Sequence, residues 1–162
     1  MSVWIDPAGI RQINLGQYVT KATTATTNGS QSLFTVAGGL VAVTALVGIA
    51  TVAFDGTVTS INLTHTPTGG AAADVAAATV VTSDALGTIY TVTGVAAETL
   101  SLQTAGGAEV PNVTFGKLWQ HGNALILPAG SLKYKGTAAD AGTVAWHLTY
   151  VPISSGATVA AA

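Results

Sequence analysis

The chain contains no cysteine and very little charge. Only 7% of its 162 residues are Asp, Glu, Lys or Arg, whereas an average soluble domain carries about 25%. The absence of cysteine excludes disulfide bonds and thiolate metal sites. Five basic and seven acidic residues give a formal net charge of −2, and the sequence has no basic stripe of the kind that binds phosphate backbones. A nucleic-acid partner is therefore not expected.

The composition is nevertheless apolar, because hydrophobic residues make up 49% of the chain. This fraction argues against a disordered protein. Ala, Val, Gly and Thr dominate, so much of the surface must consist of small, uncharged side chains. Such a surface is weakly solvated and does little to repel another copy. The composition therefore favours one domain that assembles with copies of itself or with a larger structure.

One uncharged segment, residues 36–54, approaches the length of a membrane-spanning helix. It contains Gly38, Gly39 and Gly48 and is rich in β-branched residues, which two successive strand segments explain better. We therefore expect no membrane partner.

Short β-branched and aromatic runs recur from Leu33 onward, separated by turn residues at the spacing of a sandwich or barrel. About eight strands are expected. The predicted fold class is all-β, a jelly-roll-like antiparallel β-sandwich. Residues 143–151 show the clearest two-residue alternation, and their apolar face is predicted to lie in the sandwich core. The residues of this face are Val144, Trp146, Leu148 and Tyr150.

Turn and helix signals give three further local predictions. Asp55-Gly56 is predicted to join residues 40–54 and 57–66 in a hairpin. Residues 131–135 and 143–151 are interpreted as a last strand pair around the loop 136–142. Residues 71–78 form the one plausible helix, which only their alanine content supports.

The first 30 residues differ from the remainder and are predicted to be an extended N-terminal arm and linker, with the sandwich domain at 31–162. Large apolar side chains are scattered there without a strand or helix period, and a polar run of small residues follows. The arm either docks on a partner or folds back onto its own domain. The partner-contact candidates in the arm are Trp4, Ile5, Ile10, Leu15 and Tyr18. Trp4 is the best anchor, since tryptophan is enriched at interface hot spots.

No pattern in the sequence indicates catalysis. The acidic residues do not pair at a spacing that would place two carboxylates on one strand face. His65, His121 and His147 are too far apart in sequence for a histidine metal pair, and no phosphate-binding glycine motif occurs. We expect no enzyme activity, no cofactor and no metal site. Trp119 is compatible with either a core position or a contact position.

Several turn-and-strand patterns resemble small virion structural proteins of tailed bacteriophages. The resemblance spans about residues 32–162 and leaves the arm uncovered. The patterns are residues 33–39 (LFTVAGG), 46–51 (LVGIAT), 84–90 (DALGTIY), 127–132 (LPAGSL), 141–152 (AGTVAWHLTYVP) and 156–161 (GATVAA).

The resemblance implies a β-sandwich head or capsid-decoration protein, a homotrimer without enzyme activity whose partner is the major capsid protein. It also implies a place on the virion's capsid surface after synthesis in the host cytoplasm. A tail-fibre or receptor-binding head is the alternative, with the loops 104–107 and 136–142 contacting host glycans. Those loops lack the aromatic residues that sugar sites usually present. A small hydrolase depending on His147 is the third hypothesis.

Overall fold

The computed structural model describes residues 16–23, 25–57, 59–93, 97–103 and 125–162. These residues form strands and turns and contain no helix. The strands in chain order are β1 (Gln17–Ala22), β2 (Gly29–Ala37), β3 (Val41–Val52), β4 (Ser60–Pro67), β5 (Ala73–Val80), β6 (Ile89–Thr91), β7 (Ser101–Gln103), β8 (Leu125–Leu127), β9 (Gly130–Gly136), β10 (Thr143–Pro152) and β11 (Thr158–Ala161).

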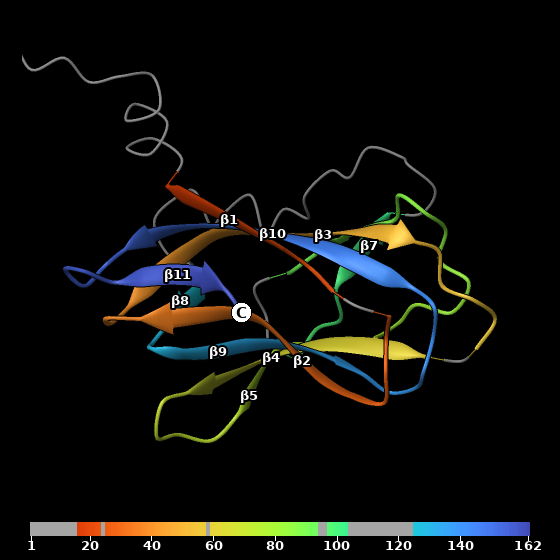
Figure 1. The fold of residues 1–162 in the computed structure, drawn as a ribbon, viewed down its shortest axis with the longest axis horizontal. Coiled ribbons are helices and arrows are strands. Elements are labelled where there is room, and N and C mark those ends of the chain that lie inside the picture. Colours follow the sequence, from red (N-terminus) through yellow and green to blue (C-terminus); the bar gives the residue numbers. More distant parts are fainter. Residues whose placement is uncertain (1–15, 24, 58, 94–96, 104–124) are drawn as a thin grey trace, which may run out of the picture.

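The strands form two antiparallel sheets that pack face to face (Figure 1). Sheet 1 has the order β1-β10-β3-β6-β7, and β8 pairs with β3 at one end. Sheet 2 has the order β11-β2-β9-β4-β5. In Figure 1 strands β1, β10, β3 and β7 of sheet 1 form the upper layer, and strands β2, β9, β4 and β5 of sheet 2 form the lower one.

The pairing follows one long hairpin that has been rolled up. Strand β1 pairs with β10, β2 with β9, β3 with β6, and β4 with β5. Rolling then brings β10 against β3 in sheet 1 and β9 against β4 in sheet 2. This is the strand order of a jelly roll, to which β7, β8 and β11 add edge strands. The predicted fold class is confirmed.

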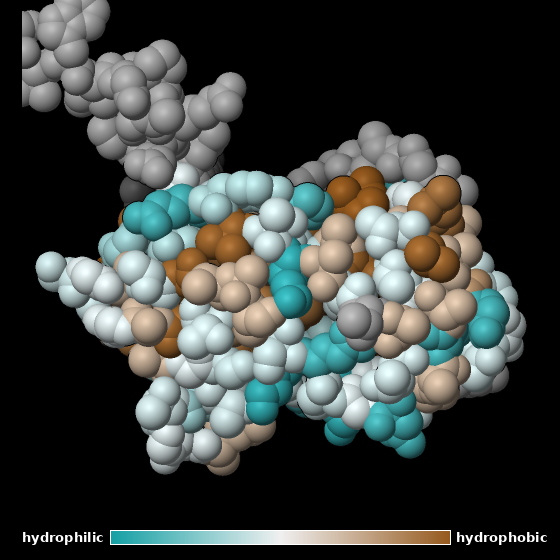
Figure 2. Space-filling view, in the orientation of Figure 1, coloured by the Kyte–Doolittle hydropathy of each residue, from teal (hydrophilic) through white to brown (hydrophobic). Residues whose placement is uncertain are grey.

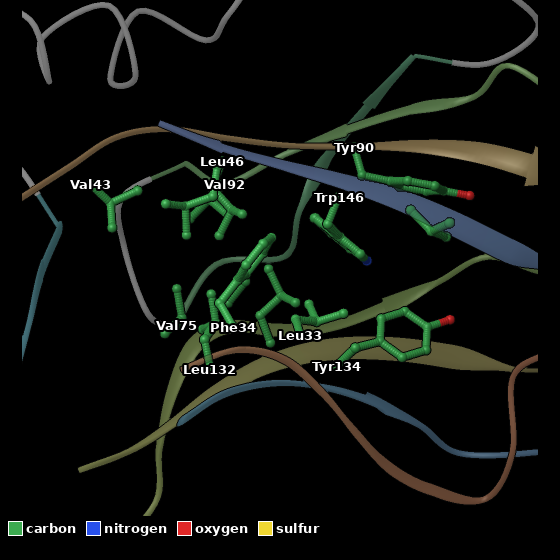
Figure 3. Close-up of a cluster of buried hydrophobic side chains, with 14 of the residues drawn as sticks. Leu33, Phe34, Val43, Leu46, Val75, Tyr90, Val92, Leu132, Tyr134 and Trp146 are labelled. Atoms are coloured by element: carbon green, nitrogen blue, oxygen red, sulfur yellow. The ribbon is translucent and has the colours of Figure 1, made fainter. Parts of the chain in front are cut away.

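The core lies between the sheets, where the inward-facing residues of both interdigitate (Figure 3). The structure buries the predicted core face of β10: Val144, Trp146 and Leu148 are 0% exposed, and Tyr150 is 2% exposed. Trp146 reaches from sheet 1 towards Tyr134 of sheet 2, with ring centroids 6.3 Å apart and planes tilted by 57°. The two largest side chains at this point therefore tie the sheets together.

A glycine makes room for the tryptophan. Gly48 of β3 is the cross-strand neighbour of Trp146. A Cβ at Gly48 would lie 2.9 Å from the Cζ3 of Trp146 and 2.9 Å from the Cγ1 of Val144. Such distances lie well inside van der Waals contact, so a side chain at this position forces its neighbours to move.

The hairpin predicted at Asp55-Gly56 is wrong. Strands β3 and β4 lie in different sheets, so this turn carries the chain across the sandwich. The predicted last strand pair is wrong for the same reason, since β9 belongs to sheet 2 and β10 to sheet 1. Turn residues indicate where the chain changes direction. They do not indicate which strands pair, because pairing depends on which strand faces are buried together in the folded sandwich.

The predicted helix at residues 71–78 is also wrong. Strand β5 occupies most of this segment and pairs with β4, with Ala76 opposite Leu63 in the core. Alanine's helix preference is a weak bias, and strand pairing along β4 overrides it. No helix in the described part of the chain is long and apolar enough to cross a membrane.

Part of the predicted arm belongs to the sandwich. Residues 17–22 are strand β1, which pairs with β10 along its whole length, and β2 begins at Gly29. This segment therefore folds back onto its own domain, which was one of the two alternatives for the arm. Residues 1–15 lie outside the described residues.

Candidate functional site

The groups that could carry chemistry do not converge. Among the described residues, no three or more His, Asp or Glu side chains are placed to hold a metal ion. His65 lies on β4 of sheet 2 and His147 on β10 of sheet 1. His121 and Trp119 lie outside the described residues.

His65 is a buried core residue. Its side chain is on the inward face of β4 and is 6% exposed, and its Nε2 has no hydrogen-bond partner. Burial lowers the pKa of His65, because a charged imidazole would lose its hydration, while a hydrogen bond to the backbone of Pro128 acts in the opposite direction. The folded protein therefore favours the neutral imidazole of His65 over the charged one.

Acid is expected to destabilise the protein through His65. Because the pKa of His65 is lower in the folded chain, the unfolded chain binds more protons below its ordinary pKa of about 6.5. The free energy of unfolding should therefore fall as the pH drops below about 6.5, by at most about 1.4 kcal/mol per pH unit.

Urea unfolding of the wild type and His65→Gln between pH 5 and pH 8 measures this contribution. The variant should show a weaker pH dependence over that range. Equal slopes in the two proteins would contradict the assignment to His65.

Four of the described carboxylates lie in loops. Glu98 is exposed, and the other three make structural hydrogen bonds. Asp140 Oδ1 accepts hydrogen bonds from the backbone N–H of Gly142 at 2.8 Å and of Asp55 at 3.2 Å. Hydrogen bonds from Thr57 to the Asp55 carboxylate hold the pKa of Asp55 below its usual range. Asp84 Oδ2 accepts a hydrogen bond from the Tyr90 hydroxyl at 2.9 Å. These contacts fix the loops between the sheets, and the side chains of Asp55 and Asp140 also contact each other.

An open hollow of about 300 Å³ lies over one end of β2, β9 and β4 in sheet 2. Its lining residues are Thr35, Val36, Thr66, Pro67, Thr68, Gly130, Ser131 and Lys133. None of them is aromatic, so the hollow lacks the stacking surface that a sugar-binding site usually offers. The loop 136–142 likewise presents no aromatic side chain, and the loop 104–107 lies outside the described residues.

Of the predicted arm contacts, the structure describes only Tyr18. Trp4, Ile5, Ile10 and Leu15 lie outside the described residues. Tyr18 projects from β1 with 61% of its side chain exposed. Its ring stacks on His147, with centroids 5.9 Å apart, and its hydroxyl hydrogen-bonds the Nδ1 of that histidine. Tyr18 is therefore part of the outer face of sheet 1.

The two outer faces of the sandwich differ in charge. The outward residues of sheet 2 include Lys133, Lys135 and Asp74, and the Nδ2 of Asn62 donates a hydrogen bond to the Asp74 carboxylate at 3.3 Å. The outward residues of sheet 1 include no Asp, Glu, Lys or Arg among the described residues. The outward residues of its strands, row by row, are Ala22, Ala145, Ile49, Ile89 and Gln103; Thr20, His147, Val47, Thr91 and Ser101; Tyr18, Thr149 and Ala45; and Val151, Ala42 and Ile126.

This face was not predicted from the sequence, although the sequence contains a signal for it. Outward positions alternate with the core residues in β3 and β10, and every one of them is uncharged. In β9 the outward positions alternate with Leu132 and Tyr134 and carry two lysines.

No family model, curated protein or solved structure matches the chain. The structure itself defines a class, an all-β jelly-roll sandwich whose outer faces, over the residues described, are one charged and one uncharged. Jelly rolls serve as capsid, lectin and enzyme domains, so the fold alone assigns no function. The function must therefore be inferred from the surfaces of this chain.

Proposed function

We propose that this chain is a structural subunit of a phage virion, which decorates and cements the capsid by associating with copies of itself and docking through its N-terminal residues. The observation that supports self-association best is the uncharged outer face of sheet 1, in a chain with 7% charged residues. A broad sheet face of small and apolar side chains gains free energy when another surface excludes water from it, by about 25 cal/mol per Å² before association costs.

The sequence patterns that resemble phage virion proteins support the virion assignment. They also suggest a trimer and a major capsid protein as the partner. A jelly-roll sandwich is compatible with such a role, because the fold is common among capsid proteins. Among the described residues, the loop carboxylates that accept hydrogen bonds hold loops in place, and they do not suggest a catalytic role that would compete with this proposal.

Copy number in purified particles tests the proposal. A stained gel of the virions should show this chain in hundreds of copies, in fixed proportion to the major capsid protein. A few dozen copies or fewer would favour the tail-fibre alternative. Absence from the particles would refute the virion role.

The structure sharpens the test of the N-terminal contact. We expect that deleting residues 2–15 abolishes capsid binding and leaves self-association intact, because the deletion stops before Gly16 and leaves β1 whole. A deletion that reached residue 20 would remove most of the strand that borders β10, and loss of binding would then reflect damage to the sheet.

The measurement is occupancy on capsids that lack the protein, after addition of the full-length or shortened chain. The control is a Trp4→Ala variant of the full-length chain, which should lose part of the affinity if Trp4 is an anchor. Full occupancy by the shortened chain would contradict arm-mediated docking.

A further inference from the structure

We infer that the outer face of sheet 1 is the surface through which copies of this chain bind one another. The inference rests on the proposed self-association and assigns it to one face of the sandwich.

An apolar row crosses the sheet at the end where β8 joins it. Val151 and Ile126 are both cross-strand neighbours of Ala42, so the three side chains lie side by side on the outer face. Val151 is 43% exposed and Ile126 is 45% exposed. The row continues into the adjoining loops, where the N–H of Ile153 donates a hydrogen bond to the carbonyl of Leu40 at 2.9 Å, and both side chains are exposed.

The centre of the face is also uncharged and partly apolar. Val47 and Ile49 of β3 lie opposite His147 and Ala145 of β10, all half-buried on the outward side. Ile89 of β6 extends the same row on the other side of β3. Figure 2 views the sandwich edge-on and shows brown, apolar side chains along the upper layer, at the rim of this face, above a lower layer that is largely white and teal.

The charged side chains of the described residues lie elsewhere. Sheet 2 carries Lys133, Lys135 and Asp74 on its outer face. Of the loop carboxylates, Asp55, Asp84 and Asp140 accept hydrogen bonds, and Glu98 is exposed in the loop before β7. Lys21 of β1 is on the inward side of its strand, where its amine donates a hydrogen bond to the carbonyl of Ala162 beside β11. The outer face of sheet 1, as far as the structure describes it, has no Asp, Glu, Lys or Arg side chain that could pair with a charge brought by a partner.

This absence defines the partner's chemistry. A Lys or Asp side chain pressed against the face would lose its hydration and gain no counter-ion, which costs several kcal/mol. The partner must therefore present an uncharged surface of comparable size. Another copy of this chain presents such a surface, because its own sheet 1 and the apolar loops around it meet the requirement. In the proposed trimer, different parts of this face on neighbouring copies would meet, because a ring of three subunits needs a heterologous contact.

The area of the face reaches the lower end of the range for a stable contact. With strands spaced about 4.8 Å apart and rising about 3.3 Å per residue, the strands of sheet 1 cover about 600 Å². A standard protein interface buries about 800 Å² on each partner, with a lower limit near 600 Å². The surrounding exposed side chains of Leu40 and Ile153 add to this area.

A matched pair of substitutions on the full chain tests the inference. Thr149→Glu places a charge in the middle of the outer face of sheet 1, between Tyr18 and Ala45. Thr64→Glu makes the same change on the outer face of sheet 2, between Lys133 and Asp74. Both threonines are half-buried strand residues, so the two variants differ mainly in the face that receives the charge.

Light scattering after size-exclusion chromatography measures the mass of each protein over a range of concentrations. We expect the wild type and Thr64→Glu to be multimers of equal mass, and Thr149→Glu to dissociate with a dissociation constant raised by about tenfold or more. Circular dichroism checks that each variant is folded. If Thr149→Glu does not fold, Val151→Glu tests the same face at a position that is 43% exposed in the single subunit.

The outcomes separate this inference from the proposed function. A multimer that both sheet 1 variants leave intact overturns the assignment of the face and leaves self-association standing. A monomeric wild type overturns both, and a folding defect of the Thr149→Glu monomer would then indicate that other residues of the same chain cover the face. A multimer broken by Thr149→Glu but absent from virions supports the face and refutes the virion role.

Discussion

Replacing Trp146 by alanine is expected to lower the free energy of unfolding by about 3–5 kcal/mol. The side chain is 0% exposed and lies between the sheets, where its ring is 6.3 Å from that of Tyr134. Alanine would leave a cavity in the middle of the core, with a lost contact surface on both sheets. Since domains of this size are stable by about 5–15 kcal/mol, the loss takes a large share of the total.

Urea unfolding followed by circular dichroism measures this change, at one fixed protein concentration because association would add to the apparent stability. Leu86→Ala is the control, since Leu86 is 64% exposed and its truncation should cost less than about 0.5 kcal/mol. If alanine at position 146 lowers the free energy by less than about 1 kcal/mol, Trp146 does not join the sheets as described. Trp146→Phe supplies a milder variant if the alanine protein does not fold.

Gly48→Ala is expected to destabilise the protein by about 1–3 kcal/mol, although alanine is usually accepted in strands at least as well as glycine. The added methyl would lie 2.9 Å from both Trp146 Cζ3 and Val144 Cγ1. Neither neighbour can retreat easily, because both are 0% exposed in a filled core. The same urea titration gives the value, and Gly56→Ala is the control because no atom lies within 4 Å of a Cβ built there.

A double-mutant cycle tests the cause. In a Trp146→Leu background the shorter side chain leaves space for the methyl, so Gly48→Ala should cost clearly less than in the wild type. The difference is the coupling energy between the two positions, which for contacting residues is about 0.5–3 kcal/mol. Additive effects would show that the tryptophan is not responsible and that the cost arises from Val144 or from the backbone.

The fold class and one strand face could be predicted from sequence because their signals are local. Residues 143–151 alternate between apolar and polar side chains, and that alternation determines which face of β10 is buried. The partners of each strand could not be predicted in this way. Asp55-Gly56 is a turn in both the sequence interpretation and the structure, but β3 pairs with β10 from the far end of the chain.

Strand β1 was included in the predicted arm for a related reason. Strand β1 is an edge strand whose alternation covers six residues with Tyr18, Thr20 and Ala22 pointing outward. A run so short and so rich in threonine and alanine resembles a linker until β10 is placed beside it. The contrast between the two outer faces likewise needs the sheet order, since only pairing shows that the uncharged positions of β3, β10 and β6 adjoin one another.

The rolled hairpin has a consequence for how the chain is made. Strand β3 is bordered by β10 on one side, and β10 leaves the ribosome long after β3. Until residue 152 has been synthesised, the apolar edge of β3 has no permanent neighbour on that side, and contacts over such a long sequence separation form slowly. The nascent chain thus passes through a stage in which Val43 and Leu46, buried in the finished sandwich, are open to capture by another unfinished copy. For a protein proposed to be produced in large numbers, the timing of this one late strand would decide how much of the product folds before it aggregates.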